Sequence, residues 1–302
     1  MNSRNIPLSV PAGKTSEYIK NYDLATNGSG RLLLFAGDQK VEHLNDDFYG
    51  QKISKEDAGP EHLFKIANQS SGALLATHLG LIMRYGKQYS KIPYLVKING
   101  KTNLGLNDDK DSSRSWWDVN MVVNFKKQSG LKIVGIGYTV YLGGKNESQL
   151  LSEAAQAVYQ AHQNGLIAVI WMYPRGKGIK EEDIHTIAGG AGVAACLGAD
   201  FVKVKYPYGT RNSKQTAEKF KEVVAAAGNT KIICVGGNMR QVKEMLTTTK
   251  EQISISGTHG LAIGRNLHQR SLDNAVKLAN DLSAVIHEKT NKNSRPRFLG
   301  IL

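Results

Sequence analysis

Cysteine is scarce in this chain, which has two cysteines in 302 residues and no Cys-x-x-Cys pair. Two isolated cysteines cannot build a disulfide framework, and they lack the ligand spacing of a zinc site. Cys196 falls in a helical pattern and Cys234 in a strand pattern. We therefore expect two small buried apolar residues in a reducing compartment, which indicates a cytoplasmic protein.

Long apolar runs are also missing. No stretch approaches the ~18 consecutive apolar residues that a membrane span needs. The segment Met1 to Ile6 lacks the apolar core of a secretory signal, so we expect neither export nor contact with a membrane.

The common motifs for cofactors, metals and hydrolytic sites are absent as well. No Gly-x-Gly-x-x-Gly follows the first predicted strand, and no serine nucleophile elbow occurs. Glu42 and His43 are interpreted as a surface turn near Asp38. Four histidines fall in separate predicted units without the paired spacing of a metal site: His43, His78, His162 and His259. We expect neither a metal nor an organic cofactor.

The net charge of +13 is the unusual bulk property, and it excludes little. The basic residues are spread along the chain among 26 acidic ones, and the one basic block, Lys289 to Arg297, is interpreted as a solvated end. A nucleic-acid-binding protein usually gathers its basic residues into one patch or stripe. We expect no nucleic-acid partner, and a field that favours anionic ligands.

What the chain does contain is a regular alternation of apolar strands and helical patterns, without a composition break that would mark a linker. Short connections between such units indicate a parallel α/β fold, and eight units in about 250 residues is the size of a (β/α)8 barrel. An open doubly wound sheet is the alternative. We predict a single barrel over 1–302, with a helical extension at 1–30 and a tail at 289–302. The predicted strands are Arg31–Ala36, Ala73–Ala76, Tyr94–Ile98, Val134–Val140, Ile167–Trp171, Phe201–Lys205, Ile232–Val235 and Gly260–Ile263. The predicted helices are Lys14–Tyr22, Pro60–Asn68, Trp116–Gln128, Glu147–Asn164, Ile184–Leu197, Ser213–Ala227, Met239–Thr248 and Asn266–His287.

The sixth predicted strand carries two lysines. Side chains alternate along a strand, so Phe201, Lys203 and Lys205 share one face. An exposed edge strand would explain the lysines simply. In a barrel, however, an ammonium beside a second cation is partly deprotonated, and a neutral amine is the nucleophile that carbonyl chemistry requires. Lys203 is thus a candidate Schiff-base residue, and Lys205 either holds a phosphate or lowers the pKa of Lys203.

Two other strand ends place polar side chains at the same rim. Trp171 and Tyr173 share the inward parity of the fifth strand, and Asp38 follows the first strand with the parity of Leu34 and Ala36. A core tryptophan, an amphipathic rim tyrosine and a turn or helix-capping aspartate are the simpler interpretations. The neighbouring lysines favour a functional one.

The seventh and eighth predicted strands end in glycine turns, Gly236-Gly237 and Gly264-Arg265. Small residues at such turns let backbone amides approach an anion, and an arginine adds a forked donor. Barrels frequently bind phosphate at these two loops. We expect a phosphate site here.

Together these segments resemble the class I fructose-bisphosphate aldolases of archaeal type, the DhnA-like aldolases. The motifs that carry the resemblance are Asp38, Trp171-Met172-Tyr173-Pro174-Arg175-Gly176, Gly198 to Tyr206, Gly236-Gly237 and Gly264-Arg265-Asn266. The resemblance implies a metal-independent lyase of glycolysis and gluconeogenesis that forms a homo-oligomer, from dimer to decamer, and acts on a phosphorylated sugar.

The same resemblance implies the residue roles. Lys203 forms the Schiff base, Tyr173 donates and accepts protons, and Asp38 lies in the active site. The substrate-binding residues that it implies are Trp171, Arg175, Lys205, Gly236, Gly237, Gly264 and Arg265. Two segments depart from the family pattern: Asp38-Gln39-Lys40, where Asp-His-Gly is usual, and Lys101 to Lys132.

Two alternatives remain. One is a related Schiff-base aldolase or transaldolase-like enzyme that acts on another phosphorylated sugar, because all such enzymes share the lysine. The other is a barrel that binds sugar phosphates without catalysis. Turnover measured with a panel of ketose phosphates distinguishes the first alternative from a fructose-bisphosphate aldolase. Absence of turnover with every sugar would indicate the second alternative.

Overall fold

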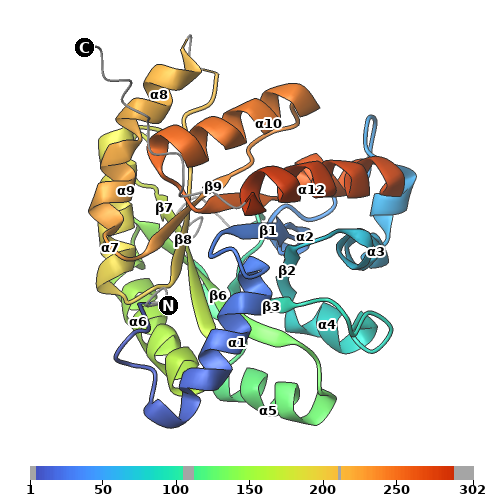
Figure 1. The fold of residues 1–302 in the computed structure, drawn as a ribbon, viewed down its shortest axis with the longest axis vertical. Helices are drawn as coiled ribbons and strands as arrows, with labels where there is room; N and C mark the ends of the chain where they lie inside the picture. The colour runs from blue at the N-terminus through green and yellow to red at the C-terminus, as the bar shows by residue number, and fades with distance from the viewer. Residues whose placement is uncertain (1–4, 105–111, 210–211, 289–302) are drawn as a thin grey trace, which may run out of the picture.

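The computed structural model describes residues 5–104, 112–209 and 212–288. Eight parallel strands close into a barrel, which helices surround (Figure 1). The predicted (β/α)8 fold is thereby confirmed. The barrel strands are β1 (Leu32–Ala36), β2 (Ala73–His78), β3 (Tyr94–Lys97), β6 (Ile133–Leu142), β7 (Ile167–Pro174), β8 (Phe201–Val204), β9 (Lys231–Val235) and β10 (Gly260–Ile263). The predicted tail at 289–302 lies outside the described residues.

Each barrel strand pairs with its neighbours in chain order, and β1 pairs with both β2 and β10 to complete the ring. The register at the centre of the site aligns Trp171 of β7 with Lys203 of β8, and His78 of β2 with Lys97 of β3. Because parallel strands end at the same edge of the sheet, these side chains reach one rim of the barrel.

The helices of the structure follow the strands around the barrel, and short 3-10, π and α turns join them. The α-helices are α1 (Thr15–Thr26), α2 (Gln39–Glu42), α3 (Glu61–Gln69), α4 (Leu79–Tyr85), α5 (Val119–Ser129), α6 (Glu147–Gln163), α7 (Ile184–Cys196), α8 (Ser213–Lys219), α9 (Lys221–Ala227), α10 (Val242–Glu251), α11 (Arg265–His268) and α12 (Leu272–His287). The other turns are η1 (Ala12–Lys14), η2 (Lys55–Ala58) and η4 (Gln252–Ser256). Among the described residues, none of the helices is both long and apolar enough to cross a membrane.

Two apolar clusters stabilise the barrel, one inside it and one between strands and helices. The interior cluster includes Leu34 and Ala36 of β1 and Val169 and Trp171 of β7. These residues have the parity that the sequence predicted to face inward. Burial of such side chains contributes about 25 cal/mol per Å² of apolar surface to the free energy of folding. The inward-facing apolar residues therefore stabilise the barrel.

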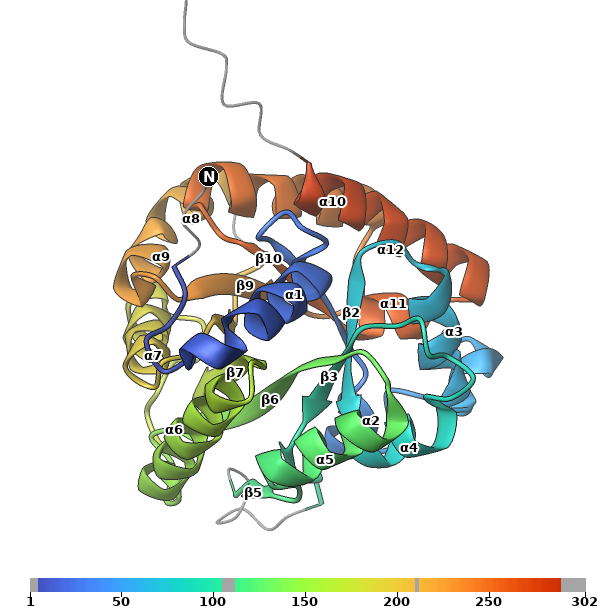
Figure 2. The ribbon, with the colours of Figure 1, turned by 60° about the horizontal axis from the view of Figure 1, so that its bottom comes forward.

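Helix α1 closes the amino-terminal end of the barrel, where it lies across the strands (Figure 2). Tyr22 of α1 stacks on Phe201 at the start of β8, with ring centroids 5.7 Å apart. A buried polar chain fixes the same contact. The Tyr18 hydroxyl donates to Asp200, whose other carboxylate oxygen lies 3.0 Å from Nε2 of His162 and accepts from the Ala168 amide at 2.7 Å.

The predicted last helix, which begins at Asn266, is broken into α11 and α12. The reason is that side chains take over its helical hydrogen bonds. Nε2 of His62 lies 3.0 Å from the carbonyl oxygens of both His268 and Arg270, and the Leu272 amide donates to Glu56 at 2.9 Å. Tertiary contacts therefore end one helix and begin the next.

The connection after β3 carries an additional two-stranded sheet, β4 (Asn99–Gly100) with β5 (Arg114–Ser115). The predicted helix at Trp116 begins three positions later, because the Asp118 side chain caps α5 by accepting the Asn120 amide at 2.6 Å. Helix α4 was not predicted from the sequence.

The two cysteines differ in exposure. Cys234 is buried, as predicted, whereas Cys196 is exposed. The buried stripe of α7 contains Ile187, Ala191 and Ala194, at helical spacing. Cys196 lies off that stripe at the end of the helix, so the prediction of burial was wrong for this residue.

Candidate active site

Lys203 lies inside the barrel near the carboxyl end of β8. Its side chain is 5% exposed, and its Nζ is 4.9 Å from the centre of the Trp171 ring. Burial lowers the pKa of the Lys203 amine, since removal from water disfavours the ammonium. The carboxylates of Asp38 and Glu42 oppose this shift in pKa, and the Lys97 cation adds to it. The site therefore holds an amine with an increased neutral fraction.

A glycine on the neighbouring strand makes room for the Trp171 indole. Gly137 of β6 has no Cβ, and a Cβ there would run into the Trp171 ring. The indole thus fills the space beside β6 and lies below both lysine amines, with Lys97 Nζ 5.6 Å from its centre. The indole ring therefore covers one side of the Lys203 amine and contributes to its burial.

Asp38 follows β1 and is 1% exposed. It occupies the N-cap position of α2, but its side chain makes no capping hydrogen bond. Its Oδ1 is buried and accepts no hydrogen bond from the described residues. Since buried carboxylate oxygens are normally satisfied, this atom is a candidate acceptor for a polar group of a ligand.

Tyr173 reaches the same rim from β7. Burial raises the pKa of its phenol, and the nearby carboxylates of Glu42 and Asp38 raise it further. The phenol is therefore protonated at neutral pH and can donate a proton. Its ring stacks on Tyr141 with centroids 6.2 Å apart, which holds it in place.

Lys97 is a further site residue, which was not identified from the sequence and is fully buried at the end of β3. Its Nζ donates to the carbonyl of Asn99 at 2.7 Å and to the Asn99 side chain at 3.1 Å, and it lies 3.7 Å from Oε1 of Glu42. Lys97 is the cation that lowers the pKa of Lys203. One of the two roles predicted for Lys205 was to lower this pKa. The available signal was a lysine at the end of an apolar strand, the same signal that identified Lys203.

Glu42 was interpreted as part of a surface turn, and the structure corrects this. It ends α2, and its carboxylate faces the barrel mouth, where it pairs with Lys97 and acts on the pKa of both Lys203 and Tyr173. Only its neighbour His43 turns away, to Asp47 at 2.6 Å. The short helix α2 after β1 separates the two side chains.

His78 is a further residue of the rim that the sequence did not single out as functional. It is 6% exposed and stacks on Trp116 with centroids 4.8 Å apart. Burial, aided by the Lys97 cation, lowers the pKa of His78 to about 4, so the imidazole is neutral. Trp116 belongs to the segment Lys101 to Lys132 that the sequence singled out as a departure from the family pattern, and its ring covers His78 at the mouth.

Arg175 and Lys205 meet on the other side of the mouth. Glu181 joins them: its Oε1 lies 3.2 Å from Arg175 Nε, and its Oε2 forms an ion pair with Lys205. The Arg175 guanidinium also lies over the rings of Tyr141 and Tyr173, at 4.8 and 5.2 Å from their centres. Arg175 therefore lies next to Tyr173, and Lys205 is linked to Arg175 through Glu181.

The two glycine loops after β9 and β10 are joined by Asn266. Its side-chain amide donates to the carbonyls of Gly237 and Asn238 at 3.2 and 2.8 Å. Gly237 has a φ of +71°, which favours glycine, and the Gly236 amide already donates to Ala262 at 2.7 Å. The two loops are thus adjacent, and the Gly236 amide is used for a hydrogen bond within the barrel.

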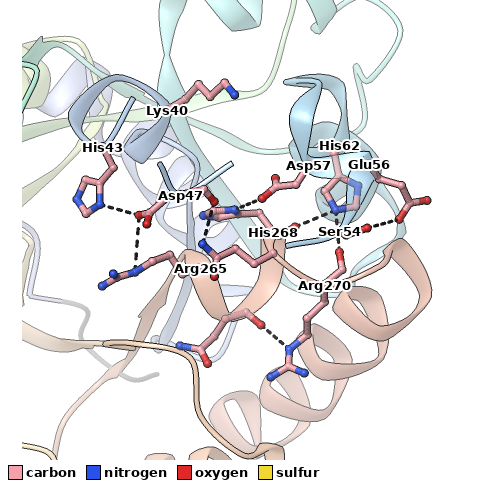
Figure 3. A network of polar contacts seen from close by, with 12 residues as sticks. Lys40, His43, Asp47, Ser54, Glu56, Asp57, His62, Arg265, His268 and Arg270 are labelled. Carbon is pink, nitrogen blue, oxygen red and sulfur yellow. Dashed lines mark hydrogen bonds and ion pairs between the residues drawn. The ribbon is translucent and has the colours of Figure 1, made fainter. Parts of the chain in front are cut away.

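Arg265 lies at the edge of a polar network that ties the loop after β1 to α11 (Figure 3). Its Nε is 3.8 Å from the Asp47 carboxylate, which His43 also contacts. Deeper in the network, His268 lies 2.7 Å from Asp57. The network orients Arg265 toward the first loop.

The departure from the family pattern at Gln39 lies against one of the glycine loops. A Cβ at Gly264 would run into the Gln39 side-chain amide, whose oxygen is buried without a hydrogen bond from the described residues. Lys40 lies over the Phe48 ring, 4.2 Å from its centre. The changed residues therefore pack against Gly264 and the network of Figure 3.

No group of three His, Cys, Asp or Glu side chains that could hold a metal ion occurs in the described ranges. The polar groups that converge at the mouth are two buried lysines, two carboxylates, a tyrosine and a neutral histidine. Such a set can form a covalent bond to a carbonyl carbon, move protons and bind anions at either side.

Comparisons with known proteins place these features in a family. A sequence model of the DeoC/LacD family of aldolases matches residues 32–270. The chain is 52% identical over 284 residues to the fructose-bisphosphate aldolase/6-deoxy-5-ketofructose 1-phosphate synthase of Methanocaldococcus jannaschii, covering 94% of this chain and 90% of that protein. It is 31% identical to the class 1 fructose-bisphosphate aldolase of Halobacterium salinarum, covering 89% and 95% of the two chains.

The chain is also similar in fold to solved structures of fructose-bisphosphate aldolases. The fructose-bisphosphate aldolase from Slackia heliotrinireducens has a TM-score of 0.90 at 48% identity, covering 94% of this chain and 90% of that one. An archaeal fructose-1,6-bisphosphate aldolase with its catalytic lysine covalently bound to the carbinolamine intermediate has a TM-score of 0.75 at 25% identity. That match covers 89% of this chain and 99% of the other.

Proposed function

The chain belongs to the DeoC/LacD family of aldolases, and we propose that it is a class I fructose-bisphosphate aldolase. The reaction is the reversible cleavage of fructose 1,6-bisphosphate into dihydroxyacetone phosphate and glyceraldehyde 3-phosphate. The observation that carries the proposal is the buried Lys203 amine with its lowered pKa at the mouth of the barrel.

Lys203 is the proposed Schiff-base residue. Its neutral amine attacks the ketone carbon of the sugar, and loss of water from the carbinolamine leaves an iminium. The bond between the third and fourth sugar carbons then breaks. Its electron pair moves into the iminium to form an enamine, while the hydroxyl on the fourth carbon loses its proton and becomes the aldehyde. The neutral amine fraction that burial produces favours the first step.

Tyr173 and Asp38 are the proposed proton carriers. The phenol of Tyr173 is protonated at neutral pH, so it can give a proton to the enamine carbon after the aldehyde leaves. Asp38 presents a carboxylate oxygen that accepts no hydrogen bond from the described residues, and this atom can hold or deprotonate a substrate hydroxyl. Water then hydrolyses the iminium and restores the Lys203 amine.

Two cationic groups flank this centre and suit a substrate with a phosphate at each end. On one side are the adjacent glycine loops with Arg265, and on the other are Arg175 and Lys205. Arginine binds phosphate through its planar fork and lysine as a point charge. We assign Gly236, Gly237 and Gly264 to phosphate binding because glycine at these turns lets the loop backbone approach an anion.

A second candidate function rests on the relative from Methanocaldococcus jannaschii, whose name includes a synthase of 6-deoxy-5-ketofructose 1-phosphate. That product has one phosphate, and its formation requires the same carbonyl chemistry. The site supports this reaction too, because Lys203 and Tyr173 act at the bond that forms or breaks, away from the far end of the sugar.

We also propose the pathway, the cellular compartment and the oligomeric state. A fructose-bisphosphate aldolase would act in glycolysis and gluconeogenesis, in the cytoplasm, as a homo-oligomer. Its support is the substrate in the names of the relatives and the resemblance of the motifs.

Release of triose phosphate from fructose 1,6-bisphosphate in a coupled assay tests the function. We expect turnover that persists in excess EDTA, because the lysine mechanism needs no metal. We expect Lys203→Met to reduce turnover to background without changing the melting temperature by more than a few degrees. Loss of activity in EDTA that Zn²⁺ restores, or normal turnover in Lys203→Met, would refute the proposal.

A further inference from the structure

Glu181 places a carboxylate between two cations at the mouth of the barrel. One oxygen contacts Arg175 at 3.2 Å, and the other contacts Lys205. The three side chains are 31–32% exposed, so they lie at the boundary between the site and solvent. They come from three places in the chain: the end of β7, the loop before α7 and the end of β8.

In the proposed function Arg175 and Lys205 bind a phosphate of the substrate, and the Glu181 carboxylate lies between the same two cations. Each of its oxygens engages one cation, as the oxygens of a bound phosphate do. Stacking on Tyr141 and Tyr173 directs the Arg175 guanidinium toward the proposed proton donor, so the pair of cations belongs to the active site. Glu181 therefore neutralises an anion site that is built into the catalytic centre.

Glu181 can leave this position without unfolding the loop. The loop is fixed at both ends: the Arg175 amide donates to Leu142 at 2.7 Å, and Asp183 caps α7 by accepting the Thr186 amide at 2.9 Å. Glu181 lies between these ends with a partly exposed side chain. Rotation about its side-chain bonds is enough to move the carboxylate into solvent, and such rotations are fast.

We propose that Glu181 is an internal competitor for the second phosphate group of the substrate and so determines selectivity between bisphosphorylated and monophosphorylated sugars. The inference rests on the proposed function. A monophosphate such as fructose 1-phosphate leaves Glu181 in place, with Arg175 and Lys205 neutralised. A bisphosphate must displace the carboxylate, so part of the attraction between its second phosphate and the two cations is lost.

The test compares kcat/KM for fructose 1,6-bisphosphate and fructose 1-phosphate in the wild type and in Glu181→Gln. Replacing a carboxylate that is about one-third exposed in its ion pairs should raise kcat/KM for the bisphosphate about two- to fivefold, the range expected for a partly solvated ion pair. We expect the value for fructose 1-phosphate to stay unchanged. The ratio of the two values is the measured quantity.

Glu182→Gln is the matched control. Glu182 is exposed and adjacent, so its replacement removes the same charge from the same loop. If it raises the ratio as much as Glu181→Gln does, general repulsion explains the effect and the proposal fails. An unchanged ratio, or an equal fall with both substrates, in Glu181→Gln also overturns it.

Binding of inorganic phosphate separates this inference from the proposed function. The probe is the phosphate concentration that half-maximally raises the melting temperature of each protein. We expect that concentration to be lower for Glu181→Gln and for Glu181→Ala than for the wild type, whether or not the wild type cleaves either sugar. Equal concentrations in all the proteins would overturn the inference. Absence of turnover with normal phosphate binding would instead refute the aldolase proposal alone.

Discussion

At the scale of single residues, the chemistry depends on how the pKa of one amine is set. Lys203 loses water contact through burial, and Lys97 lies close enough to disfavour a second positive charge. Asp38 and Glu42 act in the opposite direction. The balance leaves more neutral amine at a given pH than a free lysine would have.

Replacement of Lys97 tests this balance. Lys97→Met removes a cation that lowers the pKa of Lys203 and leaves the Glu42 carboxylate unpaired, and both changes raise that pKa. The neutral amine fraction at a given pH then falls. We expect the acidic limb of the pH profile of kcat/KM to move to higher pH. A limb at the same pH as in the wild type would show that Lys97 does not influence the nucleophile.

Replacement of Tyr173 separates proton transfer from formation of the Schiff base. Tyr173→Phe keeps the ring that stacks on Tyr141 and removes the phenol. We expect kcat to fall by about 100- to 10,000-fold, the usual contribution of a positioned acid or base. Borohydride should still trap the substrate on Lys203. A variant that neither turns over nor traps would assign Tyr173 to binding or folding.

The positions of site residues were predictable from the sequence where strand alternation decided them. Lys203, Tyr173 and Asp38 each have inward parity at a strand end, and the structure places all three around one centre. Glu42 was not predictable in this way, since the turn of α2 decides which of two adjacent side chains faces the mouth. Lys97 was visible as a lysine at the end of an apolar strand, but its contacts with Asn99 and Glu42 are tertiary.

At the scale of elements, helix α1 is held to the barrel by the buried chain of Tyr18, Asp200 and His162. The carboxylate of Asp200 also accepts the Ala168 amide at the start of β7. These contacts lie at the end of the barrel opposite to the catalytic rim. They should affect stability and leave the chemistry unchanged.

Asp200→Asn is the corresponding test. The amide replaces one acceptor oxygen by a donor nitrogen, so one buried partner among Tyr18, His162 and Ala168 loses its acceptor. We expect the free energy of unfolding, measured in urea, to fall by about 2 kcal/mol. The kcat of the folded variant should equal that of the wild type. A lower kcat in fully folded protein would contradict the assignment of this chain to structure alone.

Element boundaries were predictable where local signals set them and unpredictable where distant groups did. The helix over Glu147–Gln163 follows directly from its apolar spacing. The break between α11 and α12 depends on His62 and Glu56, about 200 positions away in sequence. The small sheet of β4 and β5 likewise depends on pairing across a long connection.

At the scale of the whole molecule, the alternation of strands and helices was enough to predict a closed barrel, because eight parallel units have few other ways to bury both faces of the sheet. Closure by β1 and β10 is confirmed. The register that brings Trp171 beside Lys203 was not predictable, since it depends on the relative shift of two strands.

The proposed reaction depends on a covalent bond between Lys203 and the substrate. The most direct measurement is mass spectrometry of the protein after mixing with fructose 1,6-bisphosphate or dihydroxyacetone phosphate and reducing with borohydride, followed by peptide mapping. A stable adduct on Lys203, absent from Lys203→Met, is the predicted result. An adduct on Lys97 or Lys205, or no adduct with either sugar on folded protein, would contradict the account.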